Sequence, residues 1–265
     1  CYQNDEARNY ISNQIPIEKV ISIFRRNGIN VKEIALDLAC AYLKSPLSPE
    51  SCLSILKLAK EALGADGKLD AEDEIVNEKL FHRSGFWILA RILRSYPELT
   101  EEVMTNSVLA SANTIFDDND EESIIPGLIF ISYVYEMNFE IPNFDYNGIL
   151  EVFASPPTRI CQIQAYKTLN KIFIRRPDLI SKFIQHGLIV QSGFALENAK
   201  YVDKIPIGLL VCNAILYDVG FACDRILQTK SISFFLDLIE YDDEELNKIA
   251  LTCIVKIVDE AIWPI

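Results

Sequence analysis

The strongest constraint on the fold is a helical pattern that recurs about every 42 residues. In each copy a small residue is followed by apolar residues one, four and seven positions later, a spacing that gathers them on one face of an α-helix. The small residues are Ala35, Gly85, Gly127, Ala165, Gly208 and Ala250. A small residue at one fixed position lets a neighbouring helix approach closely. The pattern therefore predicts a row of similar helices stacked along the chain.

A shorter apolar helix is expected before each of these long helices, with a polar turn between the two. The clearest short helices are expected at 17–24, 147–154, 188–196 and 231–240, and some copies have a further helix, at 98–105, 177–185 and 221–228. The turns supply Asp, Ser, Thr or Pro, the residues that start helices. Strand-like alternation is scarce and glycine is only 10 of 265 residues. The sequence thus predicts an all-α protein of about thirteen to sixteen helices.

The segment 149–196, ILEVFASPPTRICQIQAYKTLNKIFIRRPDLISKFIQHGLIVQSGFAL, resembles an armadillo repeat: a second helix, a polar turn, a long third helix, then a short first helix that ends at Gly187. Segment 234–258 is similar over two helices. The resemblance implies a right-handed α-solenoid of about six armadillo-like repeats in a single domain, 1–265. The expected repeats are 16–45, 49–96, 98–137, 143–175, 177–218 and 220–261. Two depart from the pattern: 49–82 is expected to hold an extra helix, and the fourth repeat lacks a good first helix.

Nothing in the sequence points to catalysis or to a metal or cofactor. His82 and His186 are the only histidines, and the seven cysteines have no metal-ligand spacing, so they are interpreted as buried apolar residues. The loop 62–73, ALGADGKLDAED, imitates a calcium-binding loop but leaves two ligand positions empty. No phosphate-binding, dinucleotide-binding or nucleophile motif occurs. The chain is therefore expected not to be an enzyme and to need no cofactor.

The charge balance excludes some classes of binding partner. Lys and Arg number 25 against 38 Asp and Glu, a net charge of −13, which would be repelled by nucleic acid and by anionic membranes. No run of 18 uncharged apolar residues occurs, so membrane insertion is not expected. The acidic clusters 117–122 and 242–245 are interpreted as helix-start carboxylates, with an acidic ridge for a basic partner as the alternative. A cytoplasmic location is expected, with the nucleus as an alternative.

The armadillo resemblance implies a concave face, lined by the third helices, that binds extended protein segments. Positions are counted from the small residue of each third helix. Importin-α proteins carry Trp at +2 and Asn at +6, and here only Trp87 matches, so an importin-α role is not expected. The +2 and +6 positions instead supply basic and aromatic residues. The candidate partner-binding residues are Trp87, Arg91, Tyr133, Lys167, Lys171 and Lys256.

These residues predict a groove for an acidic extended segment, similar to that of β-catenin-like proteins. The alternative is that the basic residues only solvate the helix face and that Trp87 packs in the core. The expected function is a protein-interaction scaffold or adaptor. The alternative is a regulatory cofactor for one client, such as an armadillo-like chaperone nucleotide exchange factor or a complex subunit. Pro126 and Pro206, each just before a small residue, are interpreted as adjusting the curvature of the superhelix, with a recognition kink as the alternative.

Overall fold

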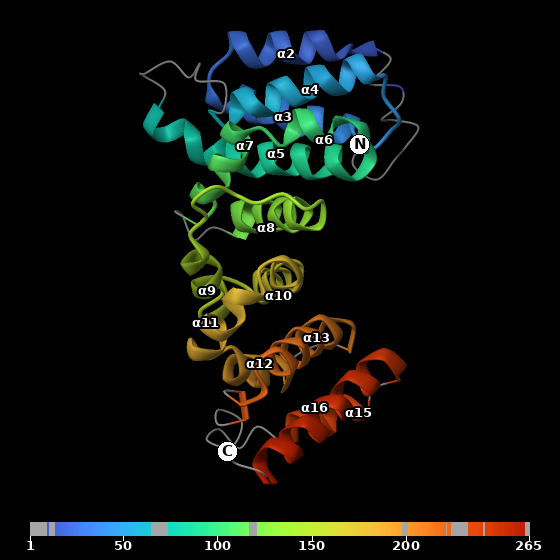
Figure 1. The fold of residues 1–265 in the computed structure, drawn as a ribbon. Coiled ribbons are helices and arrows are strands. Elements are labelled where there is room, and N and C mark those ends of the chain that lie inside the picture. Colours follow the sequence, from blue (N-terminus) through green and yellow to red (C-terminus); the bar gives the residue numbers. More distant parts are fainter. Residues whose placement is uncertain are drawn as a thin grey trace. The chain divides into compact units, whose positions relative to one another are not determined.

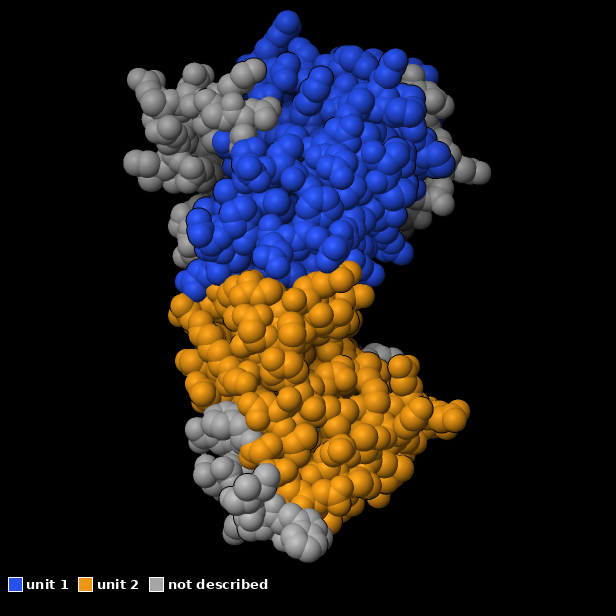
Figure 2. Space-filling view, viewed as in Figure 1, with its two compact units in different colours: residues 1–145 blue, residues 146–265 orange. Residues whose placement is uncertain are grey.

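A computed structural model describes residues 10, 14–64, 74–116, 121–197, 201–220, 222–223, 233–240 and 242–262. Regular structure in these ranges is α-helix or short 3-10 helix, with no strand, which confirms the predicted all-α class. The chain divides into two compact units, residues 1–145 and 146–265, coloured separately in Figure 2. The boundary lies close to the expected start of the fourth repeat. A single continuous domain over 1–265 stays a prediction.

Unit 1 holds the first three expected repeats. Its helices are α2 (Ile17–Arg26), α3 (Ile29–Tyr42), α4 (Pro49–Ala62), α5 (Glu74–Ser95), α6 (Thr100–Val103), α7 (Asn106–Ser111) and α8 (Glu121–Glu136), with 3-10 helices η1 (Pro97–Leu99) and η2 (Ala112–Thr114). The third helices α3, α5 and α8 pack in series, while α2 packs on α3 and α4 on α5 (Figure 1). The long, small-residue helices thus form a continuous layer within this unit.

Unit 2 repeats this arrangement. Its helices are α9 (Tyr146–Ala154), α10 (Arg159–Arg175), α11 (Ile180–Gln185), α12 (Leu188–Glu197), α13 (Tyr201–Tyr217), α15 (Ser233–Ile239) and α16 (Glu244–Ile262), with the 3-10 helix η3 (Pro177–Leu179). The third helices α10, α13 and α16 again pack in series. The expected second helices at 147–154 and 188–196 correspond to α9 and α12.

Polar residues start and stop the helices at the expected turns. Thr158 Oγ1 accepts a hydrogen bond from the Cys161 N–H at the start of α10, at 3.3 Å. Asp243 Oδ1 accepts one from the Leu246 N–H at the start of α16, at 2.8 Å. These bonds satisfy N–H groups that have no partner inside the helix. Gly187 follows α11 with a φ of +94°, a left-handed conformation that favours glycine.

The small residues lie in the packed interior, and the glycines among them mark close approaches between neighbouring elements. All six are buried. A Cβ added at Gly85 would lie 2.9 Å from two side-chain atoms of Leu63, just after α4. One added at Gly208 would lie 2.9 Å from a methyl carbon of Leu238 in α15. Each glycine therefore accommodates an aliphatic side chain from a second helix, or from the turn that follows it, and a larger residue would separate the two elements.

One expectation about the chain path is corrected. Residues 74–82 form the start of α5, a single 22-residue helix, so the described part of 49–82 holds no extra helix. Pro126 and Pro206 lie inside α8 and α13, five residues after each helix begins, and their effect on the curvature stays a prediction. The loop 65–73, the acidic residues 117–120 and all but two residues of the expected helix 221–228 lie outside the described residues.

Across the described ranges, no helix combines the length and the apolar character needed to span a bilayer.

Candidate binding face

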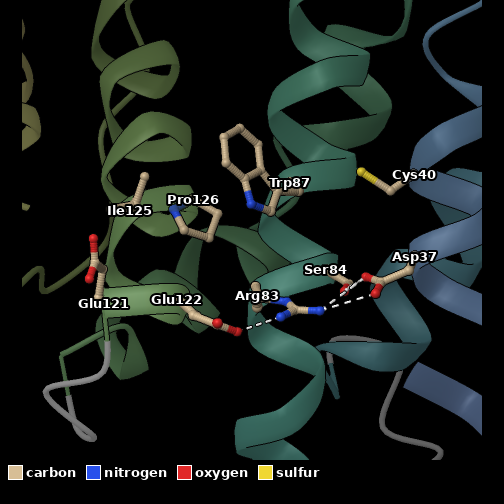
Figure 3. A pocket seen from close by; sticks show the side chains of 9 residues that line it. All are labelled: Asp37, Cys40, Arg83, Ser84, Trp87, Glu121, Glu122, Ile125 and Pro126. Carbon is tan, nitrogen blue, oxygen red and sulfur yellow. Dashed lines mark hydrogen bonds and ion pairs between the residues drawn. The ribbon is translucent and has the colours of Figure 1, made fainter. Parts of the chain in front are cut away.

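The described pockets lie on the same face of the third helices in both units. We call this face, made of positions −6, −2, +2 and +6 relative to the small residue, the third-helix face. Because these positions are four residues apart, they lie along one side of a helix. The unit 1 pocket, of about 580 Å³, is lined by Asp37, Cys40, Arg83, Ser84, Trp87, Glu121, Glu122, Ile125 and Pro126. These residues come from α3, α5 and α8, so three consecutive third helices share one pocket (Figure 3).

An ionic cluster around Arg83 forms one side of the unit 1 pocket. Arg83 Nη2 lies 3.1 Å from an Asp37 carboxylate oxygen and 3.5 Å from one of Glu33, both in α3. Its Nη1 pairs with Glu122 in α8, as the dashed lines of Figure 3 show. Ser84 Oγ donates to Asp37 at 2.7 Å. Burial lowers the Arg83 pKa, but the carboxylates of Glu122 and Asp37 outweigh burial and raise it. Arg83 therefore stays charged and links three successive third helices.

Trp87 is half-buried at the other side of this pocket, and Figure 3 shows its indole above Pro126 and Ile125. The guanidinium carbon of Arg91 lies 5.9 Å from the centre of a Trp87 ring, within the range of a cation–π contact. Arg91 Nη1 also donates to the Cys40 carbonyl at 3.3 Å. Trp87 is thus not a core residue. Arg91 is held against the indole and the backbone of α3.

In unit 2 the third-helix face has different residues at the same positions. The pocket beside α10 and α13, of about 220 Å³, is lined by Arg159, Ile160, Ile163, Gln164, Lys167 and Asp203. Arg159 lies 3.8 Å from Asp203 and forms an ion pair with it. The pocket along α16, of about 570 Å³, is lined by Glu244, Asn247, Lys248, Leu251, Thr252, Val255 and Lys256. Lys167 and Lys256 are both exposed.

The two units differ in charge on this face. Three carboxylates and one guanidinium line the unit 1 pocket. Four basic side chains and two acidic ones line the two unit 2 pockets. At the short range set by salt screening, the unit 1 pocket therefore has an excess of negative charge and the unit 2 pockets have an excess of positive charge. The basic groove that the sequence predicts stays a prediction, and the lining of the unit 1 pocket is net acidic.

The six candidate residues divide between the units. Trp87, Lys167 and Lys256 line pockets, whereas Arg91 contacts Trp87 without lining the pocket. Lys171 and Tyr133 are half-buried and line none of the described pockets. Positions +2 and +6 alone miss Arg83, Arg159 and Lys248, which also line the pockets. Extending the same four-residue spacing to −2 and −6 finds all three residues.

No family model and no curated protein matches this chain. Solved structures do match. A computationally designed armadillo repeat protein for modular peptide recognition has a TM-score of 0.65 and 13% identity, over 91% of this chain and 99% of that one. An engineered protein matches with a TM-score of 0.65 and 12% identity over 92% and 96% of the two chains. A second engineered protein has a TM-score of 0.65 and 14% identity, over 98% of this chain and 63% of that one.

These similarities show the fold, and the protein is an armadillo-like repeat solenoid.

Proposed function

We propose that this chain is a non-catalytic protein-binding scaffold whose third-helix face binds an extended segment of a partner. The observation that carries the proposal is the recurrence of pockets at equivalent positions of α5, α8, α10 and α16. A solenoid that offers equivalent pockets at repeat spacing suits an extended chain, whose side chains also recur at a fixed spacing. The similar designed protein, described as made for modular peptide recognition, supports this function.

The charge pattern gives the partner's chemistry. An acidic segment is proposed for unit 2, with Lys167, Lys171 and Lys256 as point charges. In unit 1 the carboxylates around Arg83 oppose an acidic side chain, so there Trp87 supplies stacking or apolar contact, with Tyr133 and Arg91 beyond the pocket. Exposed ion pairs contribute about 0–1 kcal/mol each, so affinity comes from several contacts together and falls as salt rises.

Peptide binding tests this proposal directly. Fluorescein-labelled 12-residue peptides, one rich in Glu, one rich in Lys and one neutral, are titrated with the protein at low and physiological salt. We expect the Glu-rich peptide to bind and the Lys167→Glu/Lys171→Glu variant to weaken it by about tenfold or more. The matched control is Lys19→Glu/Lys57→Glu, which makes the same charge change at exposed lysines of the second helices α2 and α4.

The outcomes separate the alternatives. Equal loss of binding in both double variants indicates a general charge effect and contradicts the site. Unchanged binding in Lys167→Glu/Lys171→Glu, with an unchanged melting temperature, also contradicts it. A regulatory cofactor of one client differs from a scaffold in the number of its partners. Affinity purification with such a cofactor should therefore recover a single protein in stoichiometric amount.

A further inference from the structure

Each third helix has a second side, which faces the next repeat. The contacts of α10 show which positions lie on this side. Tyr166, at +1, is hydrogen-bonded through its hydroxyl to Ser192 of α12, at 3.1 Å. Asn170, at +5, donates from Nδ2 to the Pro206 carbonyl of α13, at 2.9 Å. Positions +1 and +5 therefore contact the repeat that follows.

Position +8 faces the same way. The ring of Phe173, at +8 in α10, lies 5.2 Å from the ring of Phe183 in α11. In unit 1, Phe86 at +1 of α5 packs on Phe130 of α8, with ring centres 5.4 Å apart. We call positions +1, +5 and +8 the forward face. In α3 and α5 all three residues of this face are buried under the following repeat, whereas in α13 the +5 residue, Asn213, is exposed.

In α16 the forward face consists of aliphatic side chains that are exposed. Leu251 at +1 is 49% exposed, Val255 at +5 is 57% exposed and Val258 at +8 is 43% exposed. They form a continuous stripe, because residues separated by three, four and seven positions share one side of a helix. In α10 the equivalent positions are occupied by Tyr166, Asn170 and Phe173, all engaged by the next repeat. The α16 stripe is thus a stacking surface that nothing in the described structure covers.

The charges beside the stripe identify what covers it. Lys248 and Asp259 are both exposed, and they flank the stripe on the same side, about three turns apart. Their midpoint falls within the stripe. A second copy of α16 packed antiparallel about a two-fold axis places Lys248 opposite Asp259 of the other copy, twice. A parallel pair would place Lys248 and Asp259 of the two copies on opposite sides of the interface and form neither contact. We propose that two copies of this chain associate through antiparallel pairing of their α16 forward faces.

A head-to-tail stack is the alternative arrangement of copies. Because third helices pack on third helices, it would place the stripe against α3, which exposes Val31 and Ile34. Such a contact uses different surfaces on the two copies and allows further copies to add, so growth beyond a dimer in sedimentation would contradict the pairing. The two-fold arrangement buries aliphatic surface on both copies and keeps the charges at the rim. The inference goes beyond the proposed function because it concerns the pairing of two copies, although Lys248, Leu251 and Val255 also line the α16 pocket.

Sedimentation velocity of the 265-residue chain between about 1 and 100 µM tests the pairing. The range extends to high concentration because one helix face buries a limited area and should give a dimer of moderate affinity. We expect the mass to rise from 30.1 kDa toward twice that value with concentration. Val255→Asp should raise the dimer dissociation constant by about tenfold or more. The matched control is Ile174→Asp, at a residue of α10 that is 70% exposed, which should leave the dissociation constant unchanged.

Charge reversal tests the antiparallel register. Lys248→Asp alone and Asp259→Lys alone each place like charges together in their own dimers, so each should weaken association. An equal mixture of the two variants restores two opposite-charge contacts and should dimerise as the parent does. A chain that stays monomeric at 100 µM overturns the proposal, as expected if a further helical repeat is the natural cover. A dimer that Val255→Asp does not weaken, or reversal variants that the mixture does not rescue, also overturns it.

Discussion

Among the three glycines at small-residue positions, Gly127 should be the least tolerant of a single added methyl group. A Cβ at this position would lie 2.7 Å from both Cγ1 and Cδ1 of Ile115, and closer still to Cγ2. Ile115 is 1% exposed and two of these atoms are attached directly to its Cβ, so the side chain cannot rotate away into solvent. The added methyl group must therefore displace backbone or repack the junction between η2 and α8.

The magnitude follows from two opposing terms. Replacing glycine by alanine inside a helix stabilises by roughly 1 kcal/mol, whereas overpacking a core costs roughly 1–3 kcal/mol. With three atoms of one buried side chain inside 3 Å, the overpacking cost should lie at the upper end. Gly127→Ala should thus destabilise the protein by about 1–2 kcal/mol.

Urea denaturation followed by far-ultraviolet circular dichroism measures this change. The control is Gly193→Ala in α12, where an added Cβ would meet no atom within 4 Å and should stabilise by roughly 0.5–1 kcal/mol. Ile115→Ala in the Gly127→Ala background should cost less than Ile115→Ala alone, because the cavity receives the new methyl group. The reasoning is refuted if Gly127→Ala is as stabilising as Gly193→Ala.

Three further outcomes are expected. Ala165→Leu or Ala250→Leu should each lower stability by roughly 1–3 kcal/mol in urea denaturation, and an unchanged midpoint would contradict the repeat register. Burial raises the Tyr166 pKa above its usual 10.0, so the folded state resists ionisation there. Stability should therefore decline as the pH rises above about 10. The melting temperature of the Tyr166→Phe variant, measured over a series of pH values, should decline less steeply than that of the parent. Arg83→Met should leave neighbouring carboxylates unpaired and lower the melting temperature less at high salt than at low salt, whereas a salt-independent loss would point to packing.

Much of the fold is predictable because it depends on local chemistry. The N-cap at Thr158 and the glycine break at 187 are visible as residue types at helix ends. The position of His186 before this glycine predicts that it caps carbonyl groups, and its Nδ1 lies 2.7 Å from the Lys182 carbonyl oxygen. The start of α5 is not predictable because polar residues such as Glu74 and Asn77 are as compatible with a loop as with a helix end.

The binding face is only partly predictable, since spacing fixes which residues share a face but not how the helix is rotated in its layer. In α13 the +2 and +6 residues, Leu210 and Ala214, are both fully buried, so these two positions are core rather than surface in that repeat. The Arg83 cluster joins residues 37, 83 and 122, and such distant pairs are set by packing between repeats. Local periodicity contains no information about them.

The junctions between repeats have a consequence for modularity. The α5–α8 junction uses an aromatic pair and an arginine ion pair, whereas the α10–α12 contact uses a serine–tyrosine hydrogen bond. At the α13–α16 junction the Cys253 thiol donates to the Cys212 carbonyl, at 3.4 Å. Moving or duplicating a repeat would bring unlike chemistries together and leave buried polar groups without partners. Each repeat therefore has contacts that match only its own neighbours. The repeats cannot be exchanged with one another without losing these contacts.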